Sequence, residues 1–186
     1  MPAKDYHLDK FHIISSTEQN VEEIVRLCKT MKPEHFFHAD GKWSVAENLV
    51  HLQLSLSKSW QAMFVPKFIA KWMFGKPQHT SLPYEQLMEV YDAKLKAGAV
   101  ATKAYIPLLA NNKKSKEELI EQFEQVVTRY LNEIRYYWEE TNMDKSQYPH
   151  PLLGKITARE LMYFNVFHCA HHFRTMRQLI DRGFEL

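Results

Sequence analysis

Histidine is the residue type of this sequence whose spacing could support metal chemistry. His168 and His172 are four residues apart in the segment FNVFHCAHHFR, so on a helix their side chains lie one turn apart on the same face. Two imidazoles placed in this way can share one metal ion, and His51 is the best candidate for a third ligand. The spacing is compatible with a three-histidine metal site but does not require one.

These histidines can also be explained without a metal site. The chain contains 10 histidines, so a pair four residues apart can arise by chance. A buried histidine is more often a hydrogen-bonded core residue than a metal ligand, and a plain helical bundle is therefore an alternative. The histidines expected in loops or in the N-terminal lead-in are interpreted as surface residues; these are His7, His12, His35, His38, His79 and His150.

Several neighbouring residues could support a site. Asn165 and His171 could orient the metal ligands. Arg174 could anchor an anionic substrate, although a plain surface role is favoured. Trp43 is expected to pack at the start of its helix, near the site. Glu47 could act as a general base, but a role in capping the same helix already explains it.

Other catalytic and cofactor motifs are absent from the sequence. It contains no H-E-x-x-H, no Glu-x-x-His pair typical of di-iron bundles, no C-x-x-C-H for haem and no G-x-S-x-G elbow. Glycine, which phosphate-binding loops and tight turns require, accounts for 5 of 186 residues. Neither a nucleotide-binding loop nor a turn-rich β protein is expected.

The first half of the chain predicts two core helices. Residues 1–15 are expected to be an extended lead-in, with the first helix beginning after Ser16 or Thr17 and ending before Pro33. The second helix begins with the capping box Ser44-Val-Ala-Glu47 and carries the candidate third ligand. It is expected to end near residue 64, since a proline follows at position 66.

The other two core helices lie in the C-terminal half. Ser115 caps the third, in which apolar residues follow a helical period for about two dozen residues. Residues 141–156 are expected to be a loop. A second capping box, Thr157-Ala-Arg-Glu160, begins the last helix, which is predicted to run to about Arg182 and to stop at Gly183.

Residues 66–112 form a helical insertion between the second and third core helices. We expect a short amphipathic helix in which aromatic residues alternate with lysines, then a helix over residues 84–103, closed by Pro107 and Asn111-Asn112. The aromatic residues are Phe68, Trp72 and Phe74. The favoured interpretation packs these rings on the bundle; the alternative is a lid or a membrane-touching element.

These elements predict a single all-α domain over residues 1–186, a four-helix bundle with an insertion. Composition limits the class of partner. The net charge of +2 does not favour nucleic-acid binding, and the sequence has no membrane-spanning apolar stretch and no signal peptide. Cys28 and Cys169 form no spaced framework, so reduced thiols and a cytoplasmic location are expected.

Two segments resemble a known family. The segment from Gly41 to Leu52, with its Trp-Ser and His-Leu pairs, resembles the signature of the DinB/YfiT-like superfamily. The segment from His150 to Thr157, followed by the histidines at 168, 171 and 172, resembles the C-terminal half of that superfamily. The resemblance implies a DinB/YfiT-like four-helix bundle with a divalent metal held by His51, His168 and His172.

The same resemblance implies a reaction class. Members are metal-dependent hydrolases or transferases that use low-molecular-weight thiols, so a small-molecule substrate and a thiol co-substrate are expected. Imidazole ligands suit several divalent metals, of which zinc or nickel is preferred here. The alternative is a non-catalytic, metal-stabilised bundle that acts in stress response or binding. A homodimer is expected only because two-fold dimers are the commonest assembly.

Overall fold

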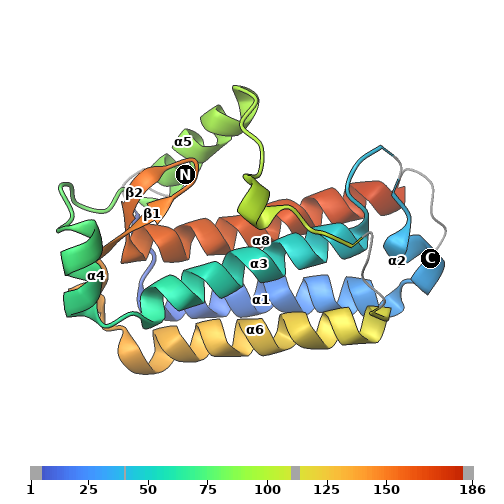
Figure 1. The fold of residues 1–186 in the computed structure, drawn as a ribbon, viewed down its shortest axis with the longest axis horizontal. Coiled ribbons are helices and arrows are strands. Elements are labelled where there is room, and N and C mark those ends of the chain that lie inside the picture. The colour runs from blue at the N-terminus through green and yellow to red at the C-terminus, as the bar shows by residue number, and fades with distance from the viewer. Residues whose placement is uncertain (1–5, 40, 110–113, 182–186) are drawn as a thin grey trace.

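A computed structural model of the chain describes residues 6–39, 41–109 and 114–181. Four long helices form a bundle, as predicted: α1 (Lys10–Thr30), α3 (Val45–Phe64), α6 (Lys116–Tyr137) and α8 (Ala158–Asp181). Helix α3 packs against α6 and α8, and α1 packs against the same two helices (Figure 1). The two helices that carry the candidate ligands, α3 and α8, are therefore neighbours.

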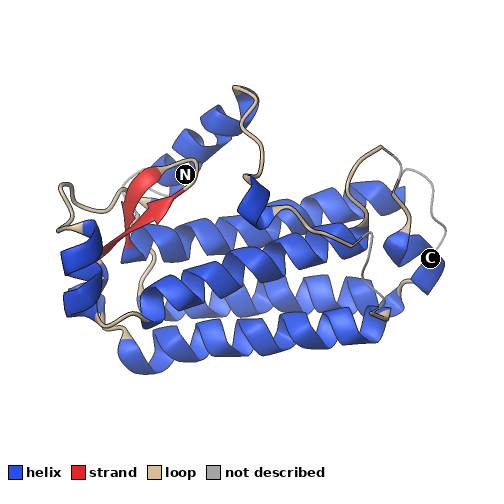
Figure 2. Cartoon of the chain, viewed as in Figure 1, coloured by secondary structure: helices blue, strands red, loops and turns tan. Residues whose placement is uncertain are grey.

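Short elements surround this bundle (Figure 2). They are α2 (Pro33–Phe37), α4 (Lys67–Phe74), α5 (Tyr84–Lys96), the 3-10 helix η1 (Lys103–Tyr105), α7 (Glu140–Met143), β1 (Gln147–His150) and β2 (Gly154–Thr157). The expected insertion between the second and third core helices thus contains α4, α5 and η1. Helix α5 packs on α8, and η1 packs on α3. No helix in the described ranges combines the length and low polarity that crossing a membrane requires.

Both predicted capping boxes are present. At the start of α3, the backbone N–H of Ser44 donates to the Glu47 carboxylate at 2.7 Å, and the Glu47 N–H donates to the Ser44 hydroxyl at 3.1 Å. At the start of α8, Thr157 and Glu160 make the same two bonds at 2.7 and 3.1 Å. Each box satisfies backbone donors that the first helical turn leaves free, so the ligand-bearing helices begin where the sequence predicts.

Two helix boundaries differ from the prediction. Helix α1 begins at Lys10, so residues 10–15 are helical rather than extended. The reason is an earlier cap: the Asp9 carboxylate accepts the backbone N–H of His12 at 2.8 Å, and Ile13 extends the buried stripe by one turn. Helix α5 ends at Lys96, not near residue 103, because Gly98 adopts a left-handed backbone with φ +89°.

The segment predicted as a loop, residues 141–156, contains regular structure. Strands β1 and β2 pair in antiparallel register, with Gln147 opposite Thr157 and His150 opposite Gly154. The hairpin is tied to the end of α4 because the Gln147 side chain donates to the carbonyl of Phe74 at 2.6 Å. Strands of four residues are too short to show a clear alternating pattern in the sequence.

The favoured interpretation of the amphipathic helix is wrong for two of its three rings. Helix α4 exists, but Phe68 is 75% exposed and Trp72 is 85% exposed. Only Phe74 packs inward, with its ring 6.0 Å from that of Tyr148. Helix α4 lies at one end of the bundle beside β1 (Figure 1). The predicted helix ends at Asn111-Asn112 and at Arg182-Gly183 lie outside the described residues.

Candidate functional site

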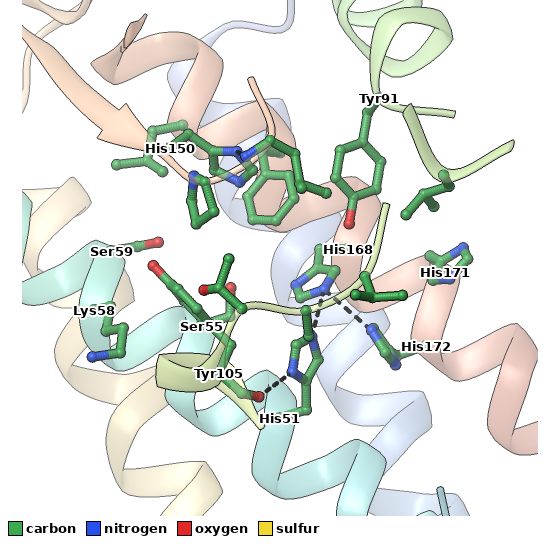
Figure 3. A pocket seen from close by; sticks show the side chains of 18 of the residues that line it. His51, Ser55, Lys58, Ser59, Tyr91, Tyr105, His150, His168, His171 and His172 are labelled. Atoms are coloured by element: carbon green, nitrogen blue, oxygen red, sulfur yellow. Dashed lines mark hydrogen bonds between the residues drawn. The ribbon is translucent and has the colours of Figure 1, made fainter. Parts of the chain in front are cut away.

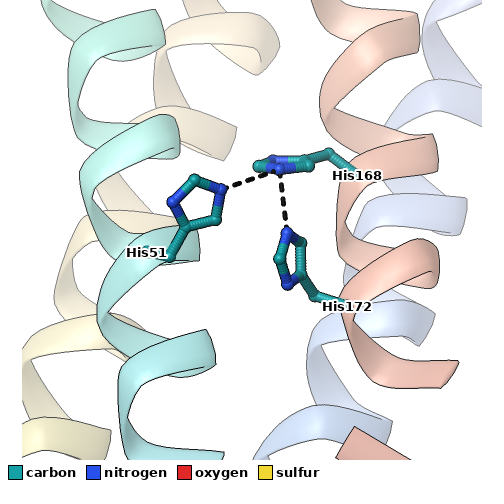
Figure 4. Close-up of side chains that lie close together, drawn as sticks. All are labelled: His51, His168 and His172. Carbon is teal, nitrogen blue, oxygen red and sulfur yellow. Dashed lines mark hydrogen bonds between the residues drawn. The ribbon is translucent and has the colours of Figure 1, made fainter. Parts of the chain in front are cut away.

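The three predicted ligands lie together between α3 and α8. The Nε2 atom of His168 is 3.1 Å from Nε2 of His51 and 3.1 Å from Nε2 of His172 (Figure 4). One nitrogen from each ring falls within 4.8 Å of the others, and all three side chains are buried. The structure thus brings together two residues that are 117 positions apart in the chain.

Hydrogen bonds at the outer nitrogens orient two of the rings. Nδ1 of His51 lies 2.7 Å from the backbone carbonyl oxygen of Tyr105. Because a carbonyl can only accept, Nδ1 carries the proton, and Nε2 of the neutral ring presents a lone pair. The Tyr105 carbonyl therefore orients this ring with its lone pair toward the other two histidines.

The ring of His172 is oriented in the same way by a side chain. Its Nδ1 lies 2.7 Å from Oδ1 of Asn48. The Asn48 amide nitrogen donates to the carbonyls of Trp43 and Ser44 at 3.2 and 2.8 Å, which identifies the other amide atom as the accepting oxygen. Nδ1 of His172 is therefore the donor, and Nε2 presents its lone pair inward.

The donor set fits a divalent metal ion. Nδ1 of His168 is buried and has no hydrogen-bond partner among the described residues, and its ring stacks on Phe164 with a centroid distance of 4.7 Å. Without a cation, a proton on Nε2 of this residue would have to be shared between two lone pairs. A cation in the centre would accept all three lone pairs, which is the ligand set typical of catalytic zinc.

Burial keeps these rings in the form that binds metal. It lowers the pKa of His51 below its ordinary value, and it lowers the pKa of His168 and His172 further, with the neighbouring histidines adding to the effect. Neutral imidazole is the ligand state of histidine. The cluster is therefore available to a metal at neutral pH.

A cavity of about 200 Å³ opens beside the cluster (Figure 3). Its wall is built from α3, α5, the segment that leads into η1, the β hairpin and α8. Apolar and aromatic side chains make up most of it, and the described residues of the wall include no aspartate or glutamate. The Trp43 ring lies against two ligands, with centroids 4.8 Å from His51 and 6.5 Å from His172. The site thus has room for a small molecule beside the three nitrogens.

The hydrogen bonds to the histidine cluster come from other residues than the two that the sequence suggested, Asn165 and His171. Asn165 is buried, but its amide bonds to the Leu161 carbonyl and the Ser59 hydroxyl, and no bond joins it to the cluster. Asn48 and the carbonyl of Tyr105 serve instead. A signal for Asn48 was present, because it lies on the same helix face as His51, but nothing in the sequence indicates a carbonyl 54 residues away.

His171, Glu47 and Arg174 lie around the site without joining the cluster. His171 lines the cavity, with its ring edge-on to His172 at 5.2 Å. The Glu47 carboxylate is engaged in its capping box, as the sequence indicates. Arg174 is exposed, stands over the Phe167 ring at 5.6 Å and does not line the cavity. The structure therefore supports the surface reading of Arg174.

His150 is not the surface residue that the sequence predicts. Its ring is half-buried at the cavity wall, 4.2 Å from the ring of Phe164. Its Nδ1 accepts backbone N–H groups from Leu152 and Leu153 at 3.2 and 3.1 Å, so the proton of the neutral ring is on Nε2. Burial lowers the pKa of His150 to about 4. His150 is the last residue of β1, and the hairpin of β1 and β2, which was not predicted from the sequence, packs against α8.

The remaining surface predictions are mixed. His7, His12 and His38 are exposed, although His12 lies in α1 and not in a lead-in. His35 is half-buried in α2. His79 is exposed, but its Nε2 contacts the buried carboxylate of Glu160 at 3.0 Å. None of them is part of the three-histidine cluster.

Comparisons with known proteins agree with this architecture. The sequence profile of the DinB superfamily matches residues 16–176. Among solved structures, the chain is similar to YfiT from Bacillus subtilis, with a TM-score of 0.61 and 16% sequence identity over 93% of this chain and 86% of YfiT. YfiT is described as a probable metal-dependent hydrolase with an unusual four-helix bundle topology. No curated protein sequence matches the chain.

Proposed function

The chain belongs to the DinB superfamily, and on that basis we propose that it is a divalent-metal-dependent enzyme whose ion is held by His51, His168 and His172. The observation that carries the proposal is the convergence of three Nε2 atoms within 4.8 Å at the wall of a small-molecule cavity. The similarity of the fold to YfiT, described as a probable metal-dependent hydrolase, supports it. Three imidazoles suit several divalent ions, among which we propose zinc or nickel.

Three features of the chain would serve catalysis. Asn48 and the Tyr105 carbonyl keep the ligand rings in one tautomer, and the Trp43 ring shields the cluster from bulk water. A bound zinc-like ion lowers the pKa of water or a thiol and so supplies a nucleophile near neutral pH. The cavity would hold a small electrophilic substrate beside the three histidines.

Two reaction classes match this arrangement: hydrolysis, and transfer of a low-molecular-weight thiol to an electrophile. The described wall residues contain no carboxylate that could serve as a general base for water. Neither class requires such a carboxylate, because a metal ion held there would lower the pKa of a bound water as well as that of a bound thiol. Product formation is measured with and without added glutathione or cysteine, in zinc-loaded and nickel-loaded protein. Product that forms only when a thiol is added indicates transfer, and product that forms without a thiol indicates hydrolysis.

Metal analysis of the purified protein tests the site itself. We expect about one equivalent of zinc or nickel per chain by inductively coupled plasma mass spectrometry, and loss of that metal in His168→Ala. His38→Ala, which changes an exposed histidine outside the cluster, is the matched control and should keep its metal. Substoichiometric metal in the unmodified protein, or full occupancy in His168→Ala, would contradict the proposal.

The coordination number separates an enzyme from a metal-stabilised bundle without activity. A catalytic site keeps an open position, whereas a structural site is closed by four protein ligands. In cobalt-substituted protein we expect the visible spectrum to change when azide or a thiol is added. A spectrum that neither ligand alters would favour the non-catalytic alternative.

A further inference from the structure

Ser55 and Lys58 are polar residues of α3 that stand, like His51, on one face of this helix and line the cavity. His51, Ser55 and Lys58 stand at positions i, i+4 and i+7 of α3, and so share one helix face. All three line the cavity (Figure 3). Seven residues span about 10 Å along a helix axis, so Lys58 lines the cavity about two helical turns away from His51.

Ser55 presents a hydroxyl that the protein leaves without a partner. The residue is 3% exposed, yet its hydroxyl makes no hydrogen bond to any described residue. The hydroxyl oxygen is not one of the fully enclosed polar atoms without a partner, so it is open to the cavity that Ser55 lines. Because Ser55 lines the cavity, a polar atom of a bound molecule would satisfy it.

Lys58 presents a positive charge without a counterion. No carboxylate of the described residues forms an ion pair with its ammonium group, which stands over the ring of Tyr105 at 5.5 Å. The described wall residues also contribute no aspartate or glutamate. A half-buried cation in an acid-free cavity attracts an anion, since electrostatic interactions are stronger there than in bulk water.

We propose that Ser55 and Lys58 form an anion-binding subsite for the substrate. The inference deepens the proposed function: the substrate is a small molecule with an apolar body and one anionic group, and its reactive end lies at the metal cluster. Tyr91, Leu95 and Leu161 are among the side chains that would contact the apolar body. In this proposal Lys58, and not Arg174, anchors the anionic group of the substrate.

Phenylacetate and phenylacetamide are suitable probes because they have similar shapes and differ in charge. Binding is measured by isothermal titration calorimetry, with the full chain both zinc-loaded and metal-free. We expect phenylacetate to bind about tenfold more tightly than the amide, in both forms and less so at high salt. Lys58→Met should abolish this difference in affinity, and Ser55→Ala should reduce it. Lys58→Arg, which keeps the positive charge, should retain it. Lys94→Met, an exposed lysine of α5 outside the wall, is the matched control.

The outcomes separate this inference from the metal proposal. Equal binding of acid and amide, or no binding of either at millimolar concentration, would overturn the subsite. A preference that needs zinc and survives Lys58→Met would also overturn it, because the carboxylate would then be a metal ligand. A preference for the acid that persists in a protein unable to bind zinc, and that depends on Lys58, would uphold the subsite while the metal proposal fails.

Discussion

Asn48 and His172 are joined by a 2.7 Å hydrogen bond that links α3 and α8 across 124 residues of sequence. Oδ1 of Asn48 accepts the Nδ1 proton of His172, and the amide nitrogen of Asn48 is held by the carbonyls of Trp43 and Ser44. The start of α3 thus sets the orientation of the His172 ring on α8. The first turn of α3 therefore carries both the capping box and the residue that orients His172.

Removing this bond should weaken metal binding without removing a ligand. For Asn48→Ala we expect zinc affinity to fall about 10- to 100-fold, because the His172 ring loses the partner that selects its tautomer. A competition titration with a chromophoric chelator measures the change. Asn132→Ala, on the half-buried face of α6, is the control and should bind zinc normally. Equal affinity in the two variants would show that Asn48 does not orient the ligand.

Metal removal should lower the stability of the fold. An ion that binds only the folded state at 100 times its Kd adds about 2.7 kcal/mol of stability. We therefore expect treatment with a chelator to lower the Tm in differential scanning calorimetry, and added zinc to restore it. The Tm of His168→Ala should respond to neither treatment. A Tm of the unmodified protein that ignores both would support the plain bundle with core histidines.

The burial of His150 predicts a loss of stability in mild acid. Its pKa is about 4 in the folded chain and near 6.5 when exposed, so the unfolded state binds the additional proton between these values. Its contribution is fully present above about pH 6.5 and is lost as the pH falls toward 4. Urea unfolding across this range should show a shallower pH dependence for His150→Asn, whose Oδ1 can accept the same backbone N–H groups. Parallel curves for the two proteins would contradict this assignment.

The ion pair of Asp144 with Arg159 should stabilise the hairpin end of the bundle. Burial alone would raise the pKa of Asp144, but hydrogen bonds from Arg159 and Ser81 outweigh it, and the net pKa is lowered below 3.8. The Arg159 guanidinium donates to both carboxylate oxygens at 2.8 and 3.0 Å. We expect Asp144→Asn to cost about 1–2 kcal/mol in urea unfolding at neutral pH.

The sign of the Asp144 effect also follows from its pKa. Because the folded pKa is the lower one, the stabilisation is present above pH 3.8 and is lost as the pH falls below that value. The difference between the unmodified protein and Asp144→Asn should therefore shrink in strong acid. A difference that stays constant with pH would point to packing and not to charge. Asp92→Asn serves as the control, because this half-buried aspartate of α5 makes no ion pair or hydrogen bond with any residue that the structure describes.

The sequence by itself determined the features that arise within one or two helical turns. The capping boxes of Ser44 and Thr157 involve bonds between residues three apart, and the His168–His172 pair follows from the helical period alone. Apolar periodicity likewise predicted the four core helices. The start of the first helix did not follow from the sequence alone, because Asp9 and Ser16 are both good capping residues. The helix begins after Asp9, which allows Ile13 to pack in the core.

Only the tertiary structure decided how these pieces meet. Three features depend on which elements pack together: the approach of His51 to His168, the carbonyl of Tyr105 behind His51, and the packing of His150 of β1 against Phe164 of α8. The same holds for Lys58: nothing in the sequence distinguishes it from a surface lysine, and only the tertiary structure places it at the wall of the cavity. Long-range contacts of this kind leave no fixed spacing in a sequence, because they are set by side-chain packing between elements far apart in the chain.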